Sequence, residues 1–216
     1  MKTKLSMLIL FTLLTTTLFT ACASKRKIVQ KERSETFIAD MEPIYLGDIH
    51  QYSCLAMNNP KVCDFAVDFY PRTNNISIEG KISVDAVYVV FSYAERVKLY
   101  NAAQKYLAAY EAGTLKDEKQ TKKNAFFTSE APIMWGVLGL SHSLKVKYAA
   151  NVEYLEENKP YFRLKFDATN DYTDNSTSPS FCIYVSPMQW QTIFELCDQE
   201  TLEAHCDEII EQGQAF

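Results

Sequence analysis

Hydrophobic and polar residues alternate along a stretch in the first half of the chain. Between residues 76 and 88 the even-numbered positions are mostly apolar and the odd-numbered ones mostly polar. A period of two residues is typical of a strand that buries one face. We therefore expect a strand here, with a bulge or bend at Gly80, and the apolar run 87–91 should be covered on both sides. Residues 62–70 alternate more loosely and end at Pro71.

A helix is expected directly after this strand. Ser92 and Glu95 have the spacing of a capping box, in which the serine oxygen accepts a free backbone amide and the glutamate reaches back to the cap. Gly113 is a suitable helix end. Between them an apolar stripe follows at helical spacing, formed by Leu99, Ala103, Tyr106 and Tyr110.

The second half of the chain shows the same order of elements. Residues 144–154 and 162–168 alternate in polarity, and a turn at Asn158 joins them into a predicted hairpin. An apolar strand, 181–185, then leads into a second capping box that begins at Ser186. Helices are expected beyond this cap.

These patterns predict the fold class. Each half is expected to end in an apolar strand, a serine cap and a helix, and the second half has helices at 188–197 and 200–212. We therefore predict an α+β fold, a mainly antiparallel sheet with helices packed on it, with two strand-strand-strand-helix halves. A closed barrel is the alternative. Residues 37–61 show no clear period and are compatible with short helical pieces over the core.

The first 21 residues are a different kind of sequence. Lys2 and Lys4 precede an uncharged apolar stretch, 5–19, which small residues follow. This plan is that of a secretory signal peptide, and the stretch is shorter than a membrane-spanning helix requires. The domains expected are a signal peptide at 1–21, a basic tether at 22–40 and a single α+β domain at 41–216.

Residues 18–22, Leu-Phe-Thr-Ala-Cys, resemble the lipobox of bacterial lipoproteins. The resemblance implies that the signal is cut between Ala21 and Cys22, and that Cys22 carries lipid, with acyl chains such as palmitate anchoring the protein to a membrane. Ala23 lacks the aspartate that retains some lipoproteins in the inner membrane, so the resemblance favours the outer membrane. The alternative is an ordinary secretory signal cut elsewhere, with Cys22 incidental.

Charge is distributed unevenly after the signal is removed. The net charge falls from −5 to −7, with +3 on residues 22–36 and −10 on the remainder. The basic tether is expected either to contact anionic head groups or to act as a solubilising spacer. An acidic domain argues against a nucleic-acid partner.

Six cysteines become five once Cys22 is lipidated, and an odd number leaves at least one thiol unpaired within the chain. Cys54 and Cys63 flank a turn signal at 58–60 and are the candidate disulfide. Cys197 and Cys206 would lie about 13 Å apart on one continuous helix, too far for a bond unless the helix breaks. The fifth, Cys182, lies in an apolar strand and is expected to be a small buried hydrophobe.

Candidate catalytic or metal-binding chemistry is sparse. Residues 47–50, Gly-Asp-Ile-His, resemble the start of a metallophosphoesterase motif, but that chemistry needs more histidines than the three present, His50, His142 and His205. The sequence shows no zinc-ligand spacing, phosphate-binding glycine loop or dinucleotide fingerprint. We expect no metal, no cofactor and no enzymatic activity, although a cysteine and a histidine brought together by the fold remain an alternative.

Short motifs resemble a group of uncharacterised spirochaete lipoproteins. They are Trp135-Gly136, the segment Lys-Pro-Tyr-Phe at 159–162 and the segment 184–190, with the helix 95–107 upstream. The resemblance spans roughly residues 75–205. It implies no activity and transfers no site.

Aromatic residues supply the remaining functional indication, because tyrosine and tryptophan suit interfaces and ligand pockets. Trp135, Trp190 and Tyr172, the last in the polar loop 170–178, are the candidate binding surface. The leading hypothesis is a non-enzymatic envelope lipoprotein, anchored to the outer membrane and facing the periplasm, that binds an envelope protein partner or helps organise the envelope. The alternative is a carrier of a small apolar ligand or lipid in an aromatic-lined cavity.

Overall fold

The computed structural model describes residues 36–55, 59–118, 121, 123–137, 139–173 and 175–214. The signal peptide 1–21, the cleavage and lipidation site at Ala21 and Cys22, and most of the tether lie outside the described residues. Residues 34–216 form one compact unit. Within the described residues, no helix is long and apolar enough to cross a membrane.

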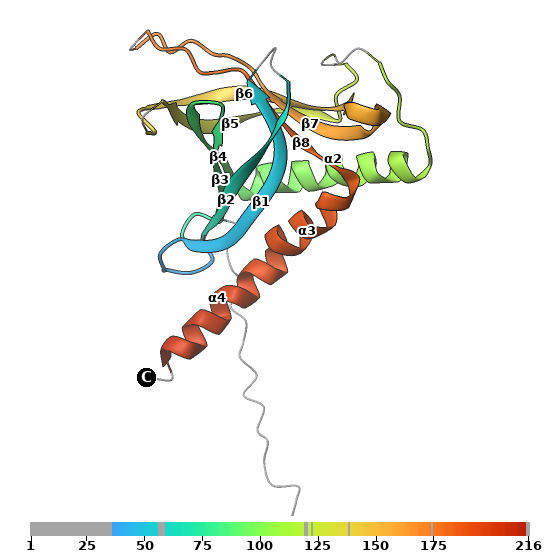
Figure 1. The fold of residues 1–216 in the computed structure, drawn as a ribbon. Helices are drawn as coiled ribbons and strands as arrows, with labels where there is room; N and C mark the ends of the chain where they lie inside the picture. Colours follow the sequence, from blue (N-terminus) through green and yellow to red (C-terminus); the bar gives the residue numbers. More distant parts are fainter. Residues whose placement is uncertain are drawn as a thin grey trace, which may run out of the picture. The chain divides into compact units, whose positions relative to one another are not determined.

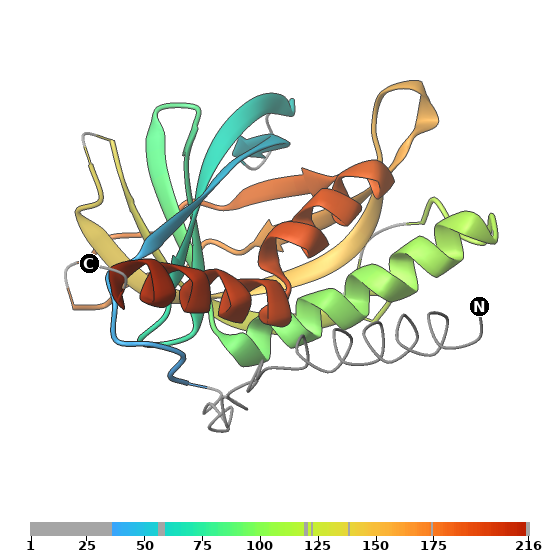
Figure 2. The same ribbon diagram turned by 90° about the horizontal axis from the view of Figure 1, so that it is seen from below.

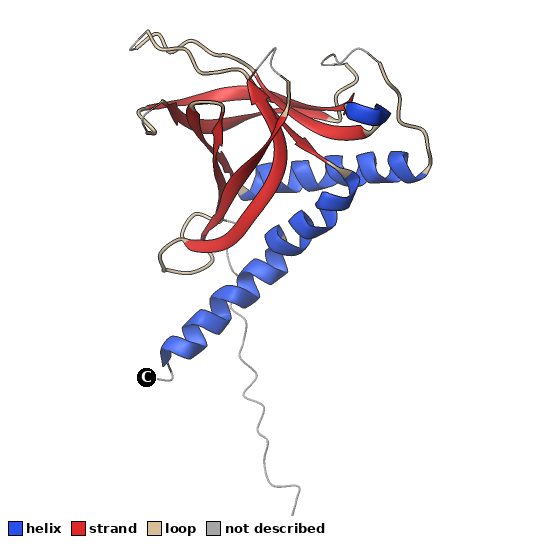
Figure 3. Ribbon diagram, in the orientation of Figure 1, coloured by secondary structure: helices blue, strands red, loops and turns tan. Residues whose placement is uncertain are grey.

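Eight strands form a closed antiparallel barrel in which each strand pairs with its neighbours in sequence (Figures 1 and 3). They are β1 (Ile44–Leu55), β2 (Lys61–Tyr70), β3 (Asn75–Ile82), β4 (Asp85–Phe91), β5 (Phe127–Gly136), β6 (His142–Tyr154), β7 (Pro160–Phe166) and β8 (Phe181–Val185). The barrel closes where Tyr52–Leu55 of β1 pair with Phe181–Tyr184 of β8.

The predicted α+β fold is therefore wrong, and the architecture is the closed barrel that stood as its alternative. Each half of the chain contributes four strands before its helix rather than three. Hydrophobic alternation shows that a strand buries one face, but it carries no information about whether the last strand pairs with the first. That pairing joins residues about 130 positions apart, such as Ser53 and Ile183.

Among the described residues, three helices accompany the barrel and lie on one side of its strands (Figures 1 and 2). They are α2 (Tyr93–Glu111), α3 (Pro187–Cys197) and α4 (Gln199–Gln214), and a 3-10 turn, η1 (Glu156–Asn158), links β6 to β7. Both predicted serine N-caps are confirmed, but only the second is a complete capping box, because the Glu95 carboxylate binds Lys98 and Tyr148 instead of the Ser92 backbone. Ser92 accepts a hydrogen bond from the Glu95 amide, and Ser186 forms a complete capping box with Gln189.

Several predicted elements need correction. Residues 44–55 form a strand and not helical pieces, and β5 lies in a segment for which no element was predicted. The alternation over 76–88 spans a hairpin and not one strand, because Ser83 adopts a positive φ of 62° and turns the chain. The buried face therefore changes from even-numbered positions in β3 to odd-numbered ones in β4. Gly80 is no bulge: it pairs in register with both Phe65 and Val87. A Cβ there would lie 2.5 Å from the Phe65 ring, so glycine is required by that close contact.

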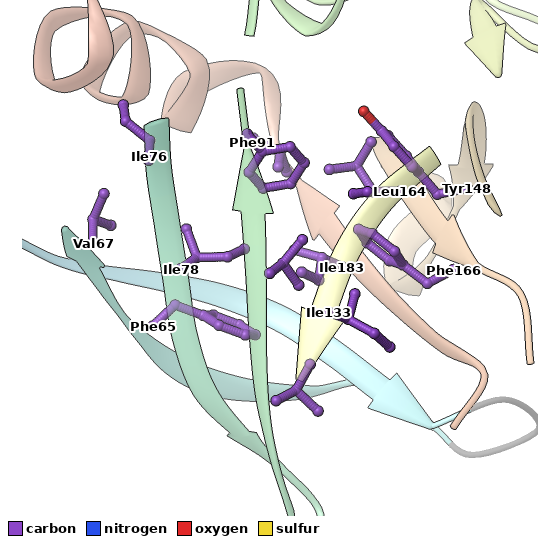
Figure 4. Close-up of a cluster of buried hydrophobic side chains, with 14 of the residues drawn as sticks. Phe65, Val67, Ile76, Ile78, Phe91, Ile133, Tyr148, Leu164, Phe166 and Ile183 are labelled. Carbon is purple, nitrogen blue, oxygen red and sulfur yellow. The ribbon is translucent and has the colours of Figure 1, made fainter. Parts of the chain in front are cut away.

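The core fills the barrel interior (Figure 4). Alternate residues of every strand point inward, as the pleat requires, and their rings stack closely. The ring of Phe166 lies 4.4 Å from that of Phe181 and 5.0 Å from that of Tyr148, measured between centroids. The core extends to α2 and α3 through Tyr106 and Trp190, which are both buried.

Two buried tyrosines fix α2 on the barrel. The Tyr106 hydroxyl donates to the Pro160 carbonyl at 3.0 Å, and the Tyr148 hydroxyl donates to the Glu95 carboxylate at 2.7 Å. Burial alone would raise the pKa of Glu95. Hydrogen bonds from Lys98, Ser129 and Tyr148, together with the Lys98 charge, outweigh burial, so the pKa of Glu95 is lowered. Glu95 is therefore ionised at neutral pH and holds α2 against β6.

Candidate functional site

An apolar pocket lies where α2 and α3 meet the barrel interior. Its volume is about 110 Å³. A dry space of this order accommodates an apolar group about the size of a benzene ring. The pocket is lined by Ile49, Gln51, Val67, Ile76, Ile78, Phe91, Arg96, Leu99, Tyr100, Leu164, Ile183, Val185, Trp190, Ile193, Phe194, Leu196, Cys197 and Asp198.

The walls of this pocket follow from the strand and helix patterns. Its barrel side consists of inward positions of six strands, such as Ile78 and Ile183 (Figure 4). Its helical side is aromatic. The Trp190 ring is stacked 5.4 Å from that of Phe194 and meets the Phe162 ring edge-on at 5.1 Å. These contacts hold the indole in one orientation beside the pocket.

Three polar atoms in this apolar wall have no hydrogen-bond partner among the described residues. They are the Gln51 Oε1 acceptor and two donors, Arg96 Nε and Trp190 Nε1. Gln51 and Trp190 are each only 2% exposed. An unpaired buried polar group costs roughly 1–3 kcal/mol, so such atoms usually meet water or a ligand. All three atoms belong to residues that line the pocket, but each atom is itself buried, so an occupant would reach it only if the side chain turned toward the pocket.

Arg96 also carries a charge into the pocket wall. The Arg96 Nη2 group donates to the Asn74 carbonyl at 3.0 Å, to Asn74 Oδ1 at 2.5 Å and to Gln199 Oε1 at 3.0 Å. The Nη1 group donates to the Cys197 carbonyl at 3.3 Å. All four acceptors are uncharged. Burial lowers the pKa of Arg96, and neighbouring groups that include Asp198 partly oppose this. The guanidinium would attract an anionic or acceptor group.

The predicted binding surface is not assembled by the fold. Trp135 is 5% exposed and stacks on His142 at 5.3 Å, whereas Tyr172 is 87% exposed on its loop. Of these three residues, only Trp190 lines the pocket, and its side chain is buried there. Composition and spacing identify useful residue types, but they do not show which way each side chain faces.

The predicted disulfide between Cys54 and Cys63 is not formed in the structure, where both are free thiols. Cys63 pairs with Gln51 across the β1–β2 ladder. Because successive residues of a strand alternate between faces, Cys54, three positions along β1, points to the other side of the barrel wall. The turn between the two cysteines is compatible with a bridge, but the strand register is not.

The remaining cysteines also differ in environment. Asp198 has an extended backbone and separates α3 from α4, so the break that a bond between Cys197 and Cys206 would require is present, although no disulfide joins the two. Burial raises the pKa of Cys197 to about 12. The Cys197 thiol is therefore not suited to act as a nucleophile at neutral pH. Cys206 is part of the buried core.

The histidine arrangements are exposed and lie outside the pocket. His50 Nδ1 is 2.6 Å from Asp64 Oδ1, but these side chains are 70% and 71% exposed. His205 lies 4.0 Å from Glu208 on α4. Within the described ranges, no group of three or more candidate ligands is placed to hold a metal ion.

Two pocket residues, Gln51 and Arg96, escaped the sequence analysis. The position of Arg96 could have been noticed in the sequence. It stands three residues before Leu99 and seven before Ala103, and therefore on the apolar stripe of its helix. A charged residue on a core-facing stripe is unusual and marks a buried interaction. The sequence gives no comparable indication for Gln51, since its strand shows no clear alternation of apolar and polar residues.

The fold and this pocket define a class of protein: a closed eight-stranded barrel whose helix-covered end holds an apolar pocket. Residues 20–204 match the model of the family described as uncharacterised Treponema protein, and the chain belongs to that family. An uncharacterised protein of Treponema pallidum (strain Nichols) is 27% identical over 208 residues, which cover 94% of this chain and 72% of that protein. No solved structure matches.

Proposed function

We propose that the protein is an envelope lipoprotein whose barrel binds a small amphiphilic molecule without transforming it. The observation that carries the proposal is the apolar pocket with three unpartnered buried polar atoms, on Gln51, Arg96 and Trp190. Ligand pockets typically combine mostly apolar walls with a few polar groups that orient the ligand. The order of the two sequence-based hypotheses is thereby reversed in favour of the carrier.

The chemistry of the pocket limits the ligand. The apolar part of the ligand is a short alkyl chain or ring, because the volume of the pocket is about 110 Å³. Its polar end accepts hydrogen bonds from Trp190 and Arg96, and a hydroxyl or protonated acid also donates to Gln51. The Arg96 charge favours an anion, so the simplest candidate is a carboxylate whose alkyl part occupies the pocket and whose ionised head accepts from both donors. An ionised carboxylate has no hydrogen to donate to Gln51.

Binding of a protein partner has less support. Large exposed hydrophobic side chains of the described residues are spread over several elements, and only α2, with Val97, Tyr100 and Tyr110, and α4, with Ile209 and Ile210, carry more than one. Hydrophobic residues scattered singly over a surface are normal and mark no interface. A partner in the envelope thus remains secondary to the ligand in this proposal.

The membrane anchor is supported by the lipobox at 18–22 and by the basic residues that follow it. In the proposed arrangement, acyl chains on Cys22 hold the barrel at the outer membrane, facing the periplasm, and the tether spaces the domain from the lipid surface. Stable anchoring takes more than one acyl chain, which lipoprotein modification of Cys22 would supply.

The Cys22→Ser chain is expected to leave the membrane fraction. A serine has no thiol for the diacylglyceryl group, so the acyl chains that hold the protein are lost. The measurement is fractionation of cells that express each form, with intact-mass analysis of the detergent-extracted protein. A Cys63→Ser chain, which keeps the lipobox, should stay in the membrane fraction. Unmodified wild-type protein would contradict the anchor.

Filling the pocket is expected to weaken octanoate binding at least about tenfold, or 1.4 kcal/mol. Leu99→Phe enlarges a half-buried pocket side chain on α2, and Ile209→Phe on α4 is the control outside the pocket. Both changes are made in the Cys22→Ser chain, so that titration calorimetry needs no detergent. Octanol, which lacks the charge, should bind more weakly than octanoate. Equal octanoate affinity for the two variants would refute the proposed site.

A further inference from the structure

Two cysteines lie opposite each other where the barrel closes. Cys54 of β1 and Cys182 of β8 are direct partners in the antiparallel ladder. Opposite residues of such a pair point to the same face of a sheet. Both are buried, and with Tyr184 they form a small cluster separate from the main core, covered by Tyr52, Leu155 and Tyr161.

The geometry of this pair is that of a disulfide site. Opposite residues in antiparallel strands have Cα atoms about 4.5–5.5 Å apart, and disulfides occur at Cα separations of about 4.4–6.8 Å. Cys54 Sγ lies 3.8 Å from the Tyr184 hydroxyl, so the thiol already faces the pocket of side chains around Cys182. A small rotation of the two side chains would bring the sulfur atoms into bonding contact.

We propose that Cys54 and Cys182 form a disulfide in the exported protein, which links the first and last strands of the barrel covalently. Only four residue pairs join β1 to β8, and no other ladder of the described barrel has fewer. The other thiols lie elsewhere: Cys63 on the opposite face of β1–β2, and Cys197 and Cys206 on the two C-terminal helices. A single bridge between two of the five described cysteines leaves three thiols outside it, which accounts for the odd number of cysteines.

The reaction is thiol–disulfide exchange with an oxidant that carries its own disulfide, such as oxidised glutathione or a disulfide oxidoreductase. One cysteine thiolate attacks the oxidant to give a mixed disulfide, and the second displaces it. One S–S bond forms, both cysteines lose their protons, and the oxidant leaves as two thiols. Burial raises the pKa of Cys182 to about 11, so we expect the bridge to form before the barrel has closed.

Peptide mapping of the full chain, purified from the cell envelope without reductant, tests the bridge directly. The protein is alkylated under denaturing conditions before any reduction. Peptides containing Cys54 and Cys182 should be found linked, at a mass lower by two hydrogen atoms, while Cys63, Cys197 and Cys206 are alkylated. Alkylation of Cys54 or Cys182 at this stage, or a link from either to another cysteine, would overturn the proposal.

Thermal unfolding provides a second readout on the same chain. Reduction should lower Tm by roughly 5–15 °C in the wild type, because a bridge across such a long loop restricts the unfolded chain. The Cys63→Ser variant should behave alike, whereas the Cys54→Ala/Cys182→Ala variant should show no shift on reduction. An equal shift in the double variant would count against the bridge, and so would no shift in the wild type. Neither result depends on ligand binding.

Discussion

Replacing Phe162 by alanine is expected to lower the free energy of unfolding by about 3–5 kcal/mol. The side chain is fully buried, and its ring lies 5.4 Å from that of Tyr106, 5.6 Å from that of Phe126 and 5.1 Å from that of Trp190. One residue of β7 thus joins the barrel to both α2 and α3. Truncation removes these contacts and leaves a cavity that the surrounding strands cannot close.

Urea denaturation followed by circular dichroism measures this loss. Phe162→Leu, which keeps most of the volume, should cost clearly less than the alanine variant. Tyr172→Ala is the exposed aromatic control and should change the free energy of unfolding by less than about 0.5 kcal/mol. If Phe162→Ala and Tyr172→Ala had similar effects, the assignment of Phe162 to the core between barrel and helices would be wrong.

Replacing Arg96 by methionine is expected to cost about 2–4 kcal/mol. The guanidinium joins the β2–β3 turn at Asn74 to the end of α3 at Cys197 and to Gln199 of α4. Methionine keeps much of the side-chain length but leaves these oxygens without their donor. Lysine restores the charge but not the planar fork of donors, so Arg96→Lys should recover only part of the loss.

The same denaturation experiment tests this second prediction, and a surface arginine provides the control. Arg72 pairs with Asp40 at 2.7 Å, but both side chains are mostly exposed. Exposed ion pairs contribute about 0–1 kcal/mol, and Arg72→Met should fall in that range. Equal losses for the Arg72 and Arg96 variants would show that Arg96 does not hold the helices to the barrel.

Much of the secondary structure was predictable because its signals are local. The cap at Ser186, the helix after it and the hairpin around Asn158 all depend on residues close together in sequence. The hairpin turn at Ser83 was missed, because the alternation continues through it and serine is uncommon at a positive φ. Strand β1 was missed because its bulge near Gly47 interrupts the period.

The candidate site was less predictable than the fold. Trp190 was selected for its residue type, but nothing in the sequence places Gln51 beside it. The pairing of Cys54 with Cys182 was equally hidden, and the more local pair, Cys54 with Cys63, was favoured instead. Each of these relations joins distant segments, so it depends on strand register rather than on spacing along the chain.

The amino-acid sequence by itself determined the inward faces of β3, β6 and β7 and the two serine N-caps. The reason is that periodicity and capping are properties of short segments. The tertiary structure alone decided that β8 pairs with β1, and it thereby turned a predicted open sheet into a barrel with a pocket under α2 and α3. Barrel closure forms the pocket because only the long-range pairing of β8 with β1 brings Gln51, Arg96 and Trp190 into one pocket lining.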